Sequence, residues 1–206
     1  MKKNIIIIYF IFIALFTTGC PSFQDVMKTV ANLQALKFKI DRVNNFSLNR
    51  VNISNITSIK DLSFSDGLLL TQAYASKSLP TSFNVIVLAQ NPNEGVKESK
   101  GTPVTMNRME WDLYIDDIKT VSGVVEDDFT VDPSNATTEI PITISMDFYK
   151  FFANKGYDGM LNLAMQLGGV GNKPAKVMID AKPEFKTKFG VLPYPSRIKI
   201  VDKEFR

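Results

Sequence analysis

The stretch Phe83–Asn93, which reads FNVIVLAQNPN, decides the fold class of this chain. Its residues Val85 to Leu88 are β-branched or bulky apolar side chains, of the kind that suits a pleated, buried surface. Because successive side chains point to opposite faces of a strand, this run is apolar on both faces. We therefore predict a central strand whose second face is covered by another part of the chain.

The triplet Asn91-Pro92-Asn93 is predicted to end this strand. Proline has no N–H for the hydrogen-bond ladder, and it pushes the residue before it away from helical angles. Asparagine tolerates a left-handed turn and can bond its own backbone. The triplet is therefore expected to have a structural role, with no catalytic role for Asn91 or Asn93.

Further strand-like segments lie on both sides of this one. They are Leu36–Val43, Leu48–Ile56, Met109–Asp116, Ile118–Val125, Phe129–Pro133, Glu139–Phe148, Ala175–Lys182 and Ser196–Lys203. Several of them alternate apolar and polar residues, which indicates a half-buried strand. Asp116 and Asp117 are predicted to form the turn of a hairpin. About seven or eight short strands separated by turns favour a mainly β fold, a β-sandwich.

Two segments outside the strands have helical periodicity. The first, within residues 21–36, is predicted to be a short amphipathic helix that lies either on a membrane or against the domain. Its apolar face comprises Phe23, Val26, Val30 and Leu33. The second, Ser65–Ala75, places Leu68, Leu69 and Ala73 on one face, with Ser65 in position to cap the helix. Its three consecutive leucines would also suit a buried strand.

A two-part helical insert is predicted over 147–169, interrupted at Gly156 and ended at Gly168. It is the best available cover for the second face of the central strand, and the helix within residues 21–36 is the alternative. Four apolar side chains of the insert are then expected to turn inward: Phe151, Phe152, Met160 and Leu161. The glycines would let the insert lift as a lid over an apolar ligand such as an acyl chain. The simpler alternative is that the insert closes the core and does not move.

The first nineteen residues have the features of a secretory signal. Lys2 and Lys3 precede an apolar run, Asn4–Phe16, that is too short for a span of roughly 20 residues. Cys20, the single cysteine, follows small residues, and "LFTTGC" resembles the bacterial lipoprotein signal, although Thr17 stands where leucine is commonest. We predict export and lipidation at Cys20, and hence an extracytoplasmic location in the bacterial cell envelope, at either membrane.

Composition excludes several classes of function. The chain contains no histidine, which excludes a Ser-His-Asp triad, a Cys-His pair and a histidine metal site. Paired carboxylates or a Ser-Lys arrangement would remain, but neither has a local signature here. Without residues 1–19 the chain has 22 basic and 21 acidic residues, a balance that does not indicate nucleic-acid binding. The segment Lys173–Arg206 carries nine Lys or Arg against four acids, which either orients the domain at a charged membrane face or reflects solvated loops.

Two acidic pairs and one tryptophan are further candidates. Asp116-Asp117 and Asp127-Asp128 have the oxygen ligands that calcium takes, but without calcium-loop spacing they are expected to be solvated hairpin tips. Trp111 lies on an apolar strand face, so a core position is favoured over a sugar-stacking platform. We expect no metal and no cofactor.

Three segments together resemble the type 2 late-embryogenesis-abundant family, also called the water-stress and hypersensitive-response domain. They are "LPTSFNVIVLAQNPN", "WDLYIDDIKTVSG" and "TEIPITISMDF", and the terminal "PYPSRIKIVDKEF" also resembles the family's last strand. The resemblance implies an immunoglobulin- or fibronectin-III-like sandwich with a helix and no enzyme chemistry. Family members are linked to stress protection or act as extracytoplasmic binding modules. The insert at 147–169 departs from the family pattern.

These observations divide the chain into a signal (1–19), a lipidated helical segment (20–36) and one sandwich domain (37–206). The expected function is non-enzymatic: a membrane-anchored lipoprotein with a stress-protective, structural or interaction role in the envelope. Its partners would be the membrane, through the anchor, and an apolar ligand or an envelope protein. A carrier or sensor of a lipid-like ligand is the alternative, and a carboxylate-based hydrolase is a distant third.

Overall fold

The computed structural model describes residues 23–54, 56, 58–93, 101–134, 136–170 and 175–202. The predicted signal at 1–19 and the predicted lipidation site Cys20 lie outside these residues. None of the helices in the described part of the chain is both long enough and apolar enough to cross a membrane.

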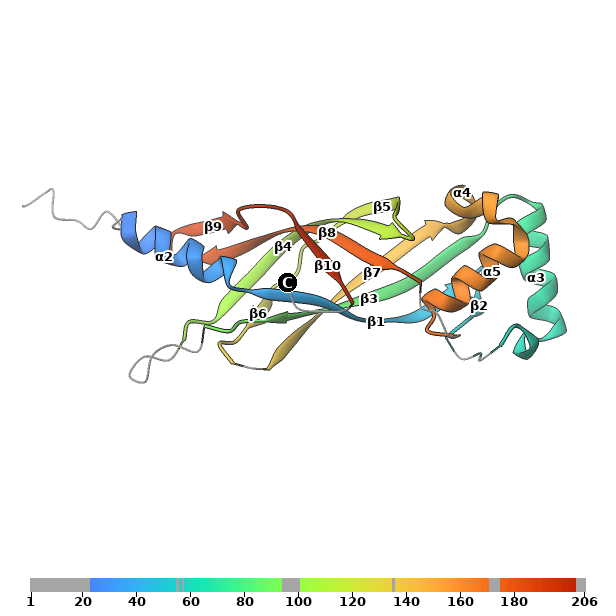
Figure 1. Ribbon diagram of the computed structural model, residues 1–206, viewed down its shortest axis with the longest axis horizontal. Helices are drawn as coiled ribbons and strands as arrows, with labels where there is room; N and C mark the ends of the chain where they lie inside the picture. The colour runs from blue at the N-terminus through green and yellow to red at the C-terminus, as the bar shows by residue number, and fades with distance from the viewer. Residues whose placement is uncertain are drawn as a thin grey trace, which may run out of the picture.

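The fold is mainly β, as the alternating segments predicted: two antiparallel sheets face each other in a sandwich-like arrangement (Figure 1). One sheet has the order β2-β1-β3-β7, with β1 at Lys37–Leu48, β2 at Val51–Asn52, β3 at Pro80–Gln90 and β7 at Thr137–Asp147. The other has the order β10-β8-β4-β5, with β4 at Val104–Ile115, β5 at Ile118–Val125, β8 at Val177–Thr187 and β10 at Ile198–Val201. Two short strands extend it: β6 (Phe129–Val131) pairs with β4, and β9 (Gly190–Pro193) pairs with β8.

Helices lie at the two ends of this elongated sandwich (Figure 1). Helix α2 (Phe23–Gln34) is at one end. At the opposite end are α3 (Phe64–Ala75), α4 (Phe148–Phe152) and α5 (Gly156–Leu167), with two 3-10 turns, η1 (Ile59–Asp61) and η2 (Ala153–Lys155). The predicted amphipathic helix and the two-part insert are therefore both present.

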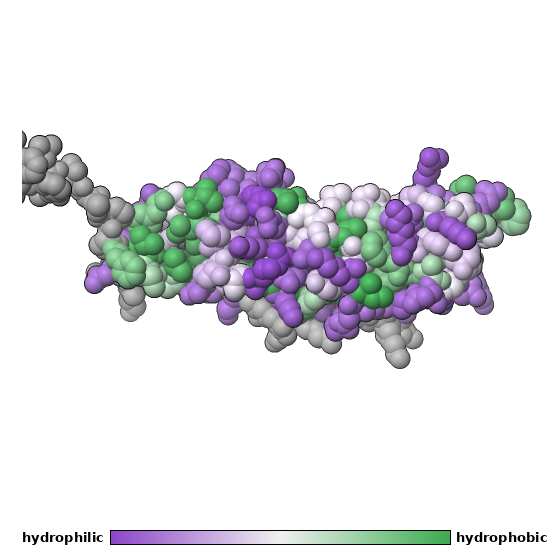
Figure 2. Space-filling view, turned by 90° about the horizontal axis from the view of Figure 1, so that it is seen from above, coloured by the Kyte–Doolittle hydropathy of each residue, from purple (hydrophilic) through white to green (hydrophobic). Residues whose placement is uncertain are grey.

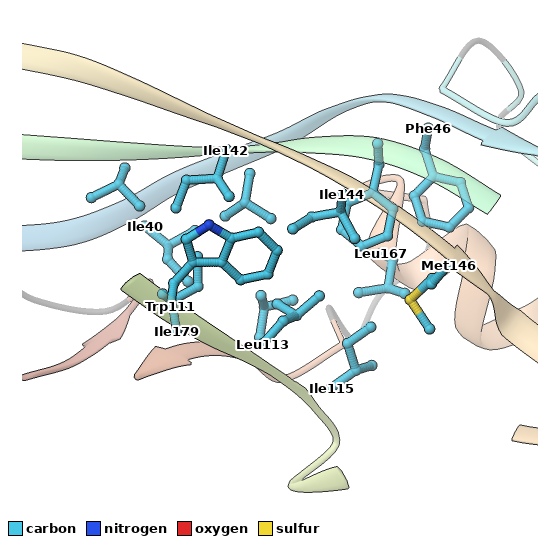
Figure 3. Packing of buried hydrophobic residues seen from close by; sticks show 14 of the residues in the cluster. Ile40, Phe46, Trp111, Leu113, Ile115, Ile142, Ile144, Met146, Leu167 and Ile179 are labelled. Atoms are coloured by element: carbon cyan, nitrogen blue, oxygen red, sulfur yellow. The ribbon is translucent and has the colours of Figure 1, made fainter. Parts of the chain in front are cut away.

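Strand β3 is central, as predicted. It pairs with β7 along its whole length, from Pro80 opposite Asp147 to Gln90 opposite Thr137, and with β1 on its other side. Its inward side chains, Val85 and Val87 among them, belong to the apolar core between the sheets. Figure 3 shows this core where Trp111 and Leu113 of β4 meet Ile142 and Ile144 of β7.

None of the described helices covers the second face of β3, because they lie at the ends of the sandwich (Figure 1), in contrast to the expectation from the sequence. Ile86 and Leu88 point outward yet are only 4% and 8% exposed. Arg42 of β1 lies opposite Ile86 and Glu139 of β7 lies opposite Leu88, and the Arg42 guanidinium donates to both carboxylate oxygens of Glu139 at 3.0 Å. Because β1 and β7 flank β3, this ion pair crosses over the strand. Long charged side chains can cover apolar surface with their stems.

Helix α3 buries only part of the predicted face: Ala73 is buried as predicted, but Leu70 takes the place of Leu68 and Leu69. Leu68 and Leu69 are 49% and 44% exposed, whereas Leu70 and Ala73 are buried. Its N-cap is Ser63, whose hydroxyl accepts a hydrogen bond from the Asp66 N–H at 3.1 Å. The predicted cap, Ser65, is already inside the helix. The N-cap therefore lies two residues earlier than predicted, and tertiary packing selects which of the leucines is buried.

Turn geometry explains two further outcomes. Asp116 and Asp117 have φ values of 48° and 65°, so they form the two-residue turn with left-handed central residues that suits a hairpin, as predicted. The strand predicted over 48–56 is reduced to β2, because Asn49 and Arg50 have φ values of 45° and 71° and reverse the chain immediately after β1. Strand β9 was not predicted, since "GVLP" is short and ends in proline.

Candidate functional site

A groove of about 490 Å³ lies between α2 and the adjacent ends of β4 and β8, and is called the α2 groove below. Two further pockets in the described residues measure about 280 and 10 Å³. Helix α2 forms one wall of the groove. The loop before β4 and the turn after β8 form the other wall. The lining residues are Asp25, Lys28, Thr29, Asn32, Leu33, Thr102, Pro103, Val104, Lys186, Thr187 and Lys188.

The C-terminal part of α2 is held against the sandwich beside the groove. Leu33 is buried in the core, and two side chains bond the last carbonyls of the helix. The Asn93 amide donates to the Asn32 carbonyl at 3.0 Å, and the Tyr194 hydroxyl donates to the Gln34 carbonyl at 3.2 Å. The N-terminal part of α2 extends past the ends of the strands (Figure 1), and Phe23 at its start is 78% exposed.

The Asn91-Pro92-Asn93 triplet ends β3 at Gln90, as predicted, and it also organises this end of the molecule. Asn91 is fully buried, and its amide donates to the carbonyls of Thr102 at 3.2 Å and Val131 at 3.3 Å. Its side-chain oxygen accepts from the Asn93 N–H at 3.1 Å. The triplet thus ties β3 to a wall of the groove and, through Asn93, to α2. This role depends on tertiary contacts that no local pattern reveals.

The polar groups of the groove are mainly cationic and hydroxylic. Lys186 pairs with Asp128 at 2.5 Å, whereas Lys28 and Lys188 form no ion pair with the residues that the structure describes. The Lys188 ammonium lies 4.9 Å from the centre of the Phe189 ring. Asp25 is the one carboxylate among the lining residues, against three lysines. Ammonium groups donate hydrogen bonds and accept none, so the lysine side of this lining is suited to an anionic group.

The predicted ligand-facing residues of the insert lie at the other end of the sandwich. Phe152, Met160 and Leu161 are buried, and Phe151 is partly buried against the same core. The cavity beside Met160 and Leu161 measures about 10 Å³, at the lower limit for one water molecule. A ligand there would require α4 and α5 to move, so the ligand-facing role of these four residues stays a prediction.

Folding brings one carboxylate pair together that sequence reasoning missed. Asp112 of β4 and Asp180 of β8 are cross-strand partners, and Arg197 bridges them through contacts of 3.0 Å to each. The Ser122 hydroxyl donates to Asp112 at 2.5 Å and, with Lys119 and Arg197, holds the pKa of Asp112 below its usual value, although burial opposes this. A general acid requires a raised pKa, so this arrangement is suited to an ion pair rather than to acid catalysis.

The other candidates have structural surroundings. Trp111 is buried in the core, which confirms the core interpretation (Figure 3). Asp117 pairs with Lys176 at 2.7 Å, and Asp128 pairs with Lys186. Within the described ranges, no group of three or more acidic, histidine or cysteine side chains is arranged to hold a metal ion.

Comparisons with known proteins include a distant structural likeness. No protein-family model matches the chain, and no curated protein matches it in sequence. A solved protein from Archaeoglobus fulgidus is similar with a TM-score of 0.34 and 12% identity, over 82% of this chain and 93% of that one.

Proposed function

We propose that this protein is a non-enzymatic lipoprotein of the bacterial cell envelope, with a structural or interaction role. The observation that carries the proposal is the place of α2 at one tip of the elongated sandwich (Figure 1). Phe23 follows Cys20 by three residues, and an extended chain covers at most about 3.6 Å per residue. A lipid on Cys20 would therefore hold this tip within about 11 Å of the membrane, and the helical end would project away from it.

The finer fold and the biological role follow from the resemblance to the type 2 late-embryogenesis-abundant family. We infer an immunoglobulin- or fibronectin-III-like topology, and a protective or binding role outside the cytoplasm. Two antiparallel sheets and the buried Asn91 at the end of a central strand support this inference. The lowered pKa of Asp112, held by Ser122, Lys119 and Arg197, argues against the hydrolase, because it favours the ionised form of this carboxylate over a general acid.

A carrier or sensor of a lipid-like ligand is the second candidate. The α2 groove favours it, since about 490 Å³ is within the usual range of small-molecule sites, roughly 300–1,000 Å³. The groove lies at the α2 tip, away from the helical insert where the sequence placed such a ligand.

Metabolic labelling with a fatty-acid analogue tests the anchor. The wild-type chain, expressed in a bacterium with its own signal, should carry the label and sediment with membranes, and Cys20→Ala should lose the label. A Ser22→Ala change two residues away is the matched control and should keep it. Equal labelling of wild type and Cys20→Ala would contradict the proposal.

A further inference from the structure

We propose that the α2 groove, with the apolar side chains beside it, is a docking site for an anionic phospholipid of the membrane that carries the anchor. This inference rests on the proposed function, because it takes the α2 tip as the end nearest the membrane. The phosphate of the lipid would lie among the lysines of the groove, and the exposed apolar side chains of the tip would enter the headgroup layer.

Three lysines against one carboxylate, Asp25, give the lining of the groove a net positive charge, which is complementary to a phosphate. Lys28 on α2 and Lys188 on the turn after β8 face the groove from its two walls, and Lys186 lies beside Lys188. The ion pair between Lys186 and Asp128 leaves Lys28 and Lys188 as the cations that have no carboxylate partner in the described residues. Two ammonium groups on opposite walls can bind one phosphate together.

The surface next to the lysines is apolar. Phe23, Met27 and Val191 are 78%, 50% and 50% exposed, and Figure 2 shows hydrophobic surface at the end of the molecule where α2 lies. Phe23 and Met27 are one helical turn apart and thus share a face of α2. Exposed apolar side chains beside lysines are typical of helices that lie in a membrane interface. A soluble phosphate ligand would make no use of these exposed apolar side chains, whereas a lipid in a membrane would.

Chain length allows the groove to reach the headgroups. Phe23 can be at most about 11 Å from a lipidated Cys20, and Lys28 is five residues further, or about 7.5 Å along the helix axis. The polar layer on each side of a bilayer is roughly 5–8 Å thick. The tether is therefore short enough for the lysines of the tip to reach the phosphates of the lipids. A groove for a soluble phosphate ligand would have no reason to lie so close to the membrane.

Native mass spectrometry of the full-length, lipidated protein in detergent tests the inference. Palmitoyl-oleoyl phosphatidylglycerol should be retained at concentrations at which palmitoyl-oleoyl phosphatidylcholine is not. A lysine near an anionic surface contributes roughly fivefold to affinity, so Lys28→Gln/Lys188→Gln should weaken phosphatidylglycerol retention by about 25-fold. The matched control, Lys60→Gln/Lys150→Gln, removes the same charge at the helical end and should bind as wild type does. Thermal unfolding of each variant checks that it is folded.

Three outcomes would overturn the inference: equal retention of the two lipids, equal loss in the groove and control variants, or displacement of phosphatidylglycerol by glycerol 3-phosphate at similar concentrations. The last outcome would identify a soluble phosphate ligand. The test is separable from that of the anchor. Selective lipid retention without fatty-acid labelling at Cys20 would reject the anchor alone, and labelling without lipid selectivity would reject the docking site alone.

Discussion

Gly123 of β5 lies directly opposite Trp111 of β4, and the indole ring occupies the space where a side chain of Gly123 would be. A Cβ at this position would lie 2.8 Å from Cε2 of Trp111 and closer still to Cζ2. Trp111 is buried between the sheets and cannot move away without disturbing the core (Figure 3). The glycine is therefore required by a close approach.

Gly123→Ala should destabilise the domain by ~1–3 kcal/mol, because it overpacks a filled core. Urea unfolding followed by tryptophan fluorescence measures the change. Gly67→Ala is a control with the opposite sign: Gly67 is within α3 and has no neighbouring atom within 4 Å of an added Cβ. It should stabilise the domain by about 0.5–1 kcal/mol, the usual advantage of alanine in a helix. Equal stability of the two variants would contradict the packing described here.

Asn91→Ala should lower the free energy of unfolding by ~2–3 kcal/mol, since it removes two hydrogen bonds that the buried Asn91 amide donates, to the carbonyls of Thr102 and Val131. Asn93→Ala should cost ~1 kcal/mol or less, because its bond to the Asn32 carbonyl is exposed. Pro92→Ala should cost little, as the turn needs no N–H there. Chemical denaturation of the three variants gives the ranking, and an Asn93→Ala variant less stable than Asn91→Ala would be inconsistent with it.

The two faces of β3 should tolerate charge very differently. Val87→Asp is expected to prevent folding, because it places an unpaired carboxylate in the core. Leu88→Lys, one residue further on, should leave the protein folded, since its ammonium can reach solvent beside Glu139 on the outer face. Circular dichroism and size-exclusion chromatography distinguish the outcomes. If both variants fail to fold, the cover over the outer face is less permissive than the Arg42–Glu139 ion pair implies.

The network around Asp112 should make stability depend on acidic pH. The pKa of Asp112 is lowered in the folded state. As the pH falls through the ordinary aspartate pKa of about 3.9, the unfolded state therefore binds more protons than the folded state does. The contribution of Asp112 is thus present above that pH and is lost below it, as the pH falls through the folded-state pKa. Asp112→Asn should flatten this part of the profile, and Ser122→Ala, which removes the largest cause of the shift, should flatten it partly. Identical slopes below pH 4 in all three proteins would refute this assignment.

Amide hydrogen exchange tests whether the helical insert opens. With Leu163 and Ala164 of α5 buried and the neighbouring cavity at about 10 Å³, these amides should exchange as slowly as those of Val85 and Val87 in β3. Amides in the exposed N-terminal part of α2 are the fast-exchanging reference. Rapid exchange confined to α4 and α5 would instead favour the lid and a ligand near Phe151, Phe152, Met160 and Leu161.

Local chemistry in the sequence was sufficient to predict much of the secondary structure. The alternation in β4 and β7, the Asp116-Asp117 turn and the end of β3 at Asn91 are each determined within a few residues. Side-chain alternation, left-handed turn residues and the missing N–H of proline act over that range. The mainly β class and the central place of β3 followed from the same patterns.

Tertiary structure alone decided what these elements meet. The bond from Asn93 to Asn32, the cover of Arg42 and Glu139 over β3, and the Arg197 bridge between two aspartates join residues that are far apart in the chain. The choice of Leu70 over Leu68 and Leu69 as the buried leucine of α3 has the same origin. Periodicity records which face of an element is apolar, but partners are selected by strand register and by the way elements dock, and these are properties of the whole packed chain.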